Sequence, residues 1–281
     1  MSPGEHTVIG QLLLTTVVAF FGLALPGYWL LRKFWPECGW NLGGSVPTSG
    51  FQKWDLLVLG GLTIYYLASW REMRGADAIH NDLTTGKIIT SAFAYLGGAA
   101  ILGMILARRV NLVEYFGLRW SRWLWIFLIV PAFLGVMFFF SAIIHQSGWV
   151  EAVQTRFGTQ LQEGVQLLMK TNDQSLILVM IFTAVIAAPV AEEVIFRGYI
   201  YPLVKRYSEG WFAAIFSASL FAAVHMNLLG FPLFFIIGLA MVLLYEKTGS
   251  IWPCIICHMA FNGLNIGRII LMRFLGHDFV L

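Results

Sequence analysis

The sequence is poor in charged residues. Asp, Glu, Lys and Arg make up only 12% of its 281 residues, whereas 58% are hydrophobic. A typical soluble domain carries about 25% charged residues, so an ordinary soluble fold is excluded. The net charge of +3 is spread among the predicted loops, which argues against a nucleic-acid-binding surface. This composition predicts a polytopic membrane protein with the lipid bilayer as its surroundings.

Cysteine is also scarce, and three cysteines are too few for a disulfide framework. Cys254, Cys257 and His258 spell Cys-x-x-Cys-His, the signature of covalent c-type haem attachment. That chemistry needs an exposed site in an oxidising compartment, and the apolar sequence around these residues excludes it. A zinc clip formed by the three groups is an alternative. The simpler interpretation is that both cysteines are small packing residues of a membrane span.

The signatures of several other hydrolases are absent from the sequence. It contains no His-Glu-x-x-His zinc motif, no Gly-x-Ser-x-Gly nucleophile elbow and no Gly-Asp dipeptide of the intramembrane aspartyl kind. Nothing marks a nucleophilic serine. Glutamate and histidine remain as the groups able to catalyse a reaction.

The hydrophobic runs predict an all-α transmembrane bundle of about eight spans, each of about 20 residues. We expect one membrane domain, 1–281, with no appended soluble domain. An amphipathic helix is predicted near 149–168, because apolar residues recur there every three to four positions between charged ones. In the third span Gly97, Gly98 and Gly103 are expected to allow close helix approach. The expected spans are 8–31, 54–70, 87–107, 123–144, one starting near 175, 211–225, 231–246 and 251–273.

Two glutamates stand side by side in the fifth predicted span. Arg197 follows Glu193 at a helical i,i+4 distance, so we expect it to lie beside Glu193 and to leave Glu192 free. A charge inside a bilayer costs about 2.5–3.5 kcal/mol on insertion scales, so such residues call for a reason. Pro189 removes a backbone hydrogen bond just before the pair, which favours a kink and a wet cavity.

The later spans add two imidazoles and an amide. His225 closes the sixth span, and His258 and Asn262 share one helical face in the eighth. We expect Glu192 to act as a general base that activates water, although its role could overlap with that of Glu193. His225 would orient the water or protonate the leaving amine. His258 and Asn262 would bind the oxyanion of a tetrahedral intermediate.

Three motifs in this order resemble those of the CAAX protease and bacteriocin-processing family, whose eukaryotic members are the Ras-converting endopeptidases. They are Glu-Glu-x-x-x-Arg at 192–197, Phe-x-x-x-His at 221–225 and His-x-x-x-Asn at 258–262. The resemblance is specific over about 187–265. It extends more diffusely to Phe-Gly-Leu-Arg at 116–119.

This resemblance implies an intramembrane glutamic endopeptidase with a catalytic core over about 175–273. By that resemblance, Glu192 and His225 activate water while His258 and Asn262 stabilise the oxyanion, without a metal. Zinc bound by Glu192, Glu193, His225 and His258 remains an alternative. The implied partner is a membrane-associated protein or peptide, lipidated in some cases, that loses a CAAX-like tail, a sorting anchor or a leader. We expect a multi-pass protein of a prokaryotic plasma membrane.

Two other classes of function remain open from the residues. The first is a transporter or channel with an intramembrane Glu/His proton relay. Such proteins commonly contain inverted repeats, yet the first half of this chain has no second Glu-Glu pattern. The second is a non-catalytic immunity or scaffold protein in which the polar residues only pair helices. Replacing Glu192 with the isosteric Gln separates both classes from a protease.

Overall fold

The computed structural model describes residues 21, 23–34, 44–64, 84–157 and 163–275. Within these ranges the chain is helical with connecting loops and no strand, which confirms the all-α prediction. Five helices are long and apolar enough to span a membrane, and the protein is a multi-pass integral membrane protein. These helices are Thr85–Ala107, Trp123–Gln146, Gln174–Tyr207, Phe231–Thr248 and Trp252–Leu275.

The predicted number of eight spans is not settled by the described residues. Two further apolar helices, Asp55–Ile64 and Gly210–Val224, are shorter than a full span. The first predicted span is described only from residue 21, and the second only as far as residue 64. The remainder of both lies outside the described residues, so the count of eight stays a prediction.

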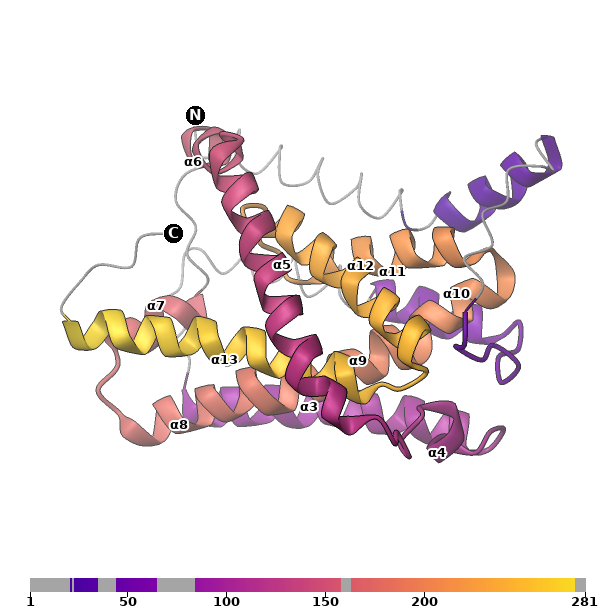
Figure 1. Ribbon diagram of the computed structural model, residues 1–281, viewed down its shortest axis with the longest axis horizontal. Helices are drawn as coiled ribbons and strands as arrows, with labels where there is room; N and C mark the ends of the chain where they lie inside the picture. Colours follow the sequence, from indigo (N-terminus) through magenta and orange to yellow (C-terminus); the bar gives the residue numbers. More distant parts are fainter. Residues whose placement is uncertain (1–20, 22, 35–43, 65–83, 158–162, 276–281) are drawn as a thin grey trace.

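The helices used below keep the labels of Figure 1. Between residues 84 and 171 they are α3 (Thr85–Ala107), α4 (Leu112–Tyr115), α5 (Ile126–Gln146), α6 (Trp149–Phe157) and α7 (Glu163–Lys170). The C-terminal part comprises α8 (Gln174–Phe182), α9 (Ala188–Ile195), α10 (Tyr201–Tyr207), α11 (Gly210–Val224), α12 (Phe231–Thr248) and α13 (Trp252–Leu275).

One continuous helix of 34 residues contains α8, α9 and α10. It begins where the Asp173 carboxylate accepts hydrogen bonds from the first free N–H groups, at Ser175 and Leu176. Two π-helical segments interrupt it, Thr183–Ala187 and Phe196–Ile200. The expected disturbance near Pro189 thus takes the form of a widened turn directly before that proline.

The helices around this long helix hold it on several sides. Figure 1 shows α5 crossing α13 obliquely, and the two are in contact. Helix α3 packs against α8 and α9, and α11 packs against both α10 and α12. The connections on either side of α11 are short, which keeps α10 and α12 next to it. A Cβ at Gly238 of α12 would lie 2.7 Å from the Cα of Ala218 in α11, so only glycine permits this approach.

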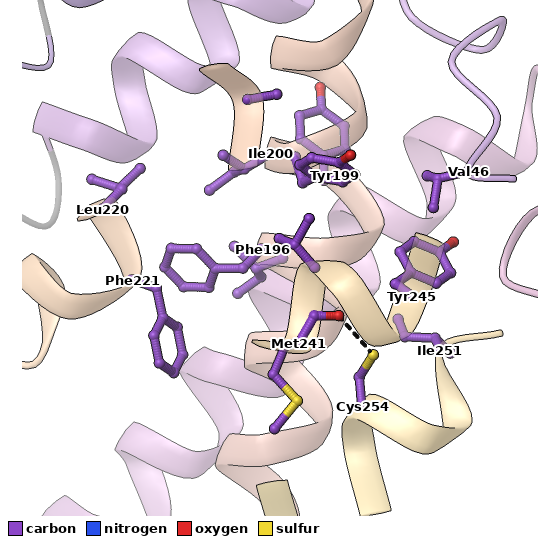
Figure 2. Close-up of a cluster of buried hydrophobic side chains, with 14 of the residues drawn as sticks. Val46, Phe196, Tyr199, Ile200, Leu220, Phe221, Met241, Tyr245, Ile251 and Cys254 are labelled. Carbon is purple, nitrogen blue, oxygen red and sulfur yellow. Dashed lines mark hydrogen bonds between the residues drawn. The ribbon is translucent and has the colours of Figure 1, made fainter. Parts of the chain in front are cut away.

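Buried side chains fill the space between these helices (Figure 2). Phe196 and Phe221 meet edge to face with ring centroids 5.3 Å apart. Cys254 is fully buried and its thiol lies 3.3 Å from the carbonyl oxygen of Met241. Cys254 and Cys257 are both free and buried, as the packing interpretation expects.

The amphipathic segment is helical on both sides of residues 158–162, which lie outside the described residues. Val153 in α6 and Leu168 in α7 are buried, whereas Glu151 and Arg156 are exposed. This confirms the predicted apolar side.

The glycines of α3 do not behave as expected within the described part of the chain. Apart from chain neighbours and the backbone of α3 itself, no described atom lies within 4 Å of a Cβ built at Gly97, Gly98 or Gly103. Their small size therefore serves no close approach between described helices.

Candidate active site

Helix α9 gives its two adjacent glutamates different surroundings, because neighbouring residues on a helix point about 100° apart. The Glu193 side chain is fully buried, whereas that of Glu192 keeps 14% of its surface accessible. Glu193 faces Arg197 and α13. Glu192 faces the two motif histidines.

Glu193 and Arg197 form a buried ion pair. The Arg197 Nη1 group donates to Glu193 Oε1 at 3.1 Å, which confirms the pairing predicted from the i,i+4 spacing. The guanidinium also lies 4.4 Å from the ring centroid of Phe221, and its Nη2 lies 3.4 Å from the Gly238 carbonyl oxygen. Glu193 Oε2 and Arg197 Nε have no hydrogen-bond partner among the described residues. Pairing thus offsets the cost of burying these charges only in part.

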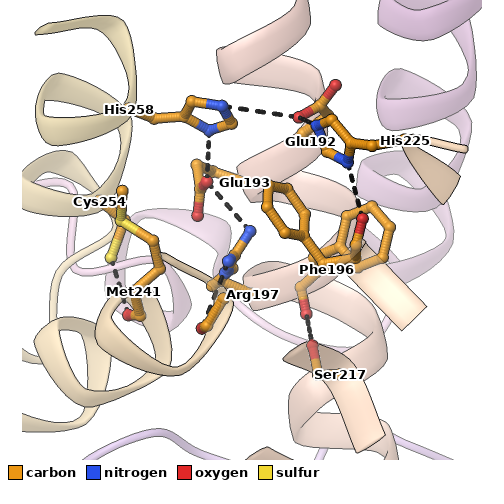
Figure 3. Close-up of polar contacts among 11 residues, drawn as sticks. Glu192, Glu193, Phe196, Arg197, Ser217, His225, Met241, Cys254 and His258 are labelled. Atoms are coloured by element: carbon orange, nitrogen blue, oxygen red, sulfur yellow. Dashed lines mark hydrogen bonds and ion pairs between the residues drawn. The ribbon is translucent and has the colours of Figure 1, made fainter. Parts of the chain in front are cut away.

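His258 joins the two glutamates (Figure 3). Its Nδ1 lies 2.8 Å from Glu193 Oε1, and its Nε2 lies 3.7 Å from Glu192 Oε2. A carboxylate that pairs with arginine is an acceptor, so Nδ1 carries a hydrogen and donates it. Glu193 therefore fixes both the orientation and the tautomer of the imidazole, and directs Nε2 toward Glu192.

His225 approaches Glu192 from the end of α11. Its Nδ1 lies 2.7 Å from the carbonyl oxygen of Phe221, and because a carbonyl only accepts, Nδ1 is the donor. The ring stacks on Phe234, with centroids 4.3 Å apart. Its Nε2 then lies 4.0 Å from Glu192 Oε2. Both Nε2 atoms are too far from this carboxylate for a direct hydrogen bond, so all three atoms retain the capacity to bind a third molecule.

The structure places Asn262 differently from the other motif residues. Its Nδ2 donates to the carbonyl oxygen of Ala184, in the first π-helical segment, at 2.9 Å. One of its two N–H groups is therefore already used by the backbone. Glu192, Glu193, Arg197, His225 and His258 form one connected cluster, and Asn262 lies one turn further along α13.

The described residues contain no group of three or more His, Cys, Asp or Glu side chains arranged to hold a metal ion. Glu193 Oε1, one atom of the zinc alternative through Glu192, Glu193, His225 and His258, is already shared by Arg197 and His258. That alternative and the clip formed by Cys254, Cys257 and His258 stay predictions.

Two polar residues that no sequence motif marks contact the helix bearing the glutamates. The Tyr115 hydroxyl donates to the Gly198 carbonyl oxygen at 2.9 Å. The fully buried Asp55 accepts from the Tyr199 hydroxyl at 2.7 Å and from Arg109 at 2.8 Å. Pro202 was the sequence signal that could have indicated the Tyr115 contact. A proline inside a helix leaves the carbonyl four residues earlier, here that of Gly198, without its helical donor.

Comparison with known proteins gives matches over the segment that carries this site. The family model described as Type II CAAX prenyl endopeptidase Rce1-like matches residues 174–264, from the start of α8 into α13. The Bacillus subtilis (strain 168) protein named "Putative membrane peptidase YdiL" is 32% identical over 83 residues, which are 30% of this chain and 34% of that protein. This chain thus spans about a third of that relative's length. No solved structure gives a significant match. The segment that carries the site, residues 174–264, is therefore similar to the Rce1-like type II CAAX prenyl endopeptidases.

Proposed function

We propose that this protein is an intramembrane endopeptidase in which Glu192 activates the attacking water. One observation carries the proposal: Glu192 Oε2 lies between two imidazole Nε2 atoms, at 3.7 Å and 4.0 Å, while its neighbour Glu193 is paired with Arg197. Of the two glutamates, Glu192 is therefore the one with an accessible carboxylate and no permanent cationic partner among the described residues. The Rce1-like family and a relative named as a membrane peptidase support the same class of reaction.

The first chemical step is addition of water to the peptide carbonyl. Glu192 takes a proton from the water, and the oxygen attacks the carbonyl carbon to form a tetrahedral intermediate. With Nδ1–H bonded to Phe221, the neutral His225 ring presents Nε2 as an acceptor, so it orients the water by accepting its other hydrogen. When the intermediate collapses, the C–N bond breaks and protonated Glu192 returns its proton to the leaving amine.

The developing oxyanion requires donors. His258 already donates Nδ1–H to Glu193, so it can donate from Nε2 only when the ring carries a second proton. The remaining N–H of Asn262 is the second donor of the proposal, while its first N–H stays on Ala184. No metal ion takes part in this mechanism.

The substrate that we propose is a membrane-associated protein with a scissile bond near a terminus. A C-terminal tail of the CAAX or sorting-anchor kind fits the prenyl-endopeptidase description of the matching family. A leader segment at the N-terminus is the other class. The site lies among apolar helices, so a lipidated or otherwise membrane-anchored chain would be delivered to it by the bilayer.

The test compares membrane-protein termini by mass spectrometry in cells that produce the wild type, Glu192→Gln or Glu151→Gln. Glu151 is an exposed carboxylate of α6, away from the cluster, and serves as the matched control. We expect a defined set of proteins to keep an extra terminal segment with Glu192→Gln only. Loss of a general base lowers rates by about 10²–10⁴-fold.

Full processing by the folded Glu192→Gln protein would refute this mechanism. Identical termini in all three strains, with wild type and both variants present in the membrane, would contradict the protease. That result would favour proton or ion coupling by the Glu/His cluster.

A further inference from the structure

The second π-helical segment contains a backbone carbonyl that lacks its usual donor. In an α-helix the carbonyl of Gly198 would accept from residue 202, but that residue is Pro202, which has no N–H. The Tyr201 N–H, one position earlier, donates to Phe196, five residues back. In a membrane an unsatisfied carbonyl costs several kcal/mol, so a donor from elsewhere in the protein is favoured.

Tyr115 supplies that donor. Its hydroxyl lies 2.9 Å from the Gly198 carbonyl oxygen, and its side chain is buried. The same turn is packed tightly, because a Cβ at Gly198 would lie 2.5 Å from Cε1 of Phe116. Tyr115 thus bonds the backbone of Gly198, and Phe116 fills the space that a side chain at Gly198 would need.

The segment that presents Tyr115 is itself fixed to the C-terminal helices. The Ile251 N–H donates to the carbonyl oxygen of Phe116 at 2.9 Å. The Tyr245 hydroxyl donates to the carbonyl oxygen of Tyr115 at 3.0 Å. The backbone that carries the Tyr115 hydroxyl is therefore held in place by the C-terminal helices.

In the first π-helical segment a side chain from another helix also bonds a backbone carbonyl. There the Ala188 N–H donates to Thr183, five residues back, and the next residue is Pro189. The carbonyl of Ala184 is left without a helical donor, and Asn262 supplies one at 2.9 Å. Both widened turns that flank the two glutamates are thus fixed by side chains from other helices.

We propose that Tyr115 is a positioning residue for the reaction, acting through Arg197; this inference rests on the proposed function. Arg197 and Gly198 are adjacent in one π-helical turn, and Arg197 bonds Glu193, which in turn holds His258. By fixing the carbonyl of Gly198, Tyr115 sets the rotation of this turn and keeps the guanidinium in register with Glu193. Tyr115 touches none of the reacting groups.

The test removes only the hydroxyl, with Tyr115→Phe, which keeps the ring contacts with Phe51 and Phe116. The matched control is Tyr201→Phe. It removes a hydroxyl from the 34-residue helix that contains Gly198. This hydroxyl bonds Glu246 at 2.6 Å and not a π-helical carbonyl. We expect Tyr115→Phe to lower kcat by roughly two- to twelvefold, the range for one hydrogen bond, with KM within about twofold of wild type. Tyr201→Phe should keep the wild-type kcat.

Steady-state kinetics are measured on the folded fraction of purified, bilayer-reconstituted protein, together with thermal unfolding. A merely structural role would lower the unfolding temperature of both variants without changing kcat per folded enzyme. Tyr199→Phe is measured in parallel, because it releases the same turn from Asp55 and remains informative if Tyr115→Phe does not fold. We expect it to lower kcat as well.

The outcomes separate the two proposals. Full cleavage by Glu192→Gln refutes the proposed function itself. An active wild type whose kcat is unchanged in Tyr115→Phe, or in Tyr199→Phe if only that variant folds, overturns the positioning role and leaves the proposed function intact.

Discussion

Replacing Arg197 with Leu should be among the most destabilising single substitutions in this protein. The guanidinium is 1% exposed and lies against the fully buried Glu193. Removing one partner of a buried ion pair leaves an uncompensated charge and costs about 3–5 kcal/mol. The contact with the Phe221 ring, at 4.4 Å, adds a cation–π interaction of about 2 kcal/mol in a desolvated setting. The simple sum of the two terms is about 5–7 kcal/mol. Because the pair is already incompletely bonded, we expect a smaller loss than this sum, about 4 kcal/mol.

A second substitution separates stability from activity. Glu193→Gln in the Arg197→Leu background removes the remaining buried charge, and an apolar or neutral replacement of a buried pair is often close to neutral. We expect the double variant to recover most of the lost stability, at least about 2 kcal/mol. It should stay inactive, because the double variant loses both the Glu193 carboxylate that orients His258 and the Arg197 guanidinium that holds this carboxylate.

The measurement is denaturant unfolding in detergent for the wild type, both single variants and the double variant, with peptidase activity on the same samples. The coupling between the two sites follows from the complete cycle of variants. A loss of less than about 1 kcal/mol for Arg197→Leu would refute the buried-pair argument. A double variant with wild-type kcat would refute the role given to Glu193.

The remaining predictions concern a turn and a metal. Gly117 adopts φ +59°, and a Cβ there would clash with the carbonyl oxygen of Gly249. Gly117→Ala should therefore destabilise the protein by about 2 kcal/mol or more in thermal unfolding, whereas Gly135→Ala, with no described atom within 4 Å, should be neutral or stabilising. A stable Gly117→Ala protein would contradict the close approach. We also expect peptidase activity to survive dialysis against a chelator, because Glu193 is already occupied by Arg197 and His258. Activity that is lost on chelation and restored by zinc alone would overturn the metal-free mechanism.

Much of the fold followed from the sequence. Composition and long apolar runs predicted a helical membrane protein, because a bilayer permits few other ways to satisfy backbone groups. Contacts within one helix were also predictable: the i,i+4 spacing was enough to identify Glu193 as the partner of Arg197. Packing between helices was harder to predict from the sequence. The glycines of α3 are an example, because small residues permit a close approach between helices but do not cause one.

For the site, too, some features followed from the sequence and others only from the tertiary structure. The sequence alone was enough to select the candidate site residues, because charged and imidazole groups in apolar spans are rare enough to identify. Only the tertiary structure decided that His258 bonds Glu193, 65 residues away, and that Asn262 caps the Ala184 carbonyl. It also brought Tyr115 onto Gly198, 83 residues along the chain. Helical periodicity reports the face on which a residue lies, whereas the crossing and register of two helices depend on the packing of all their side chains.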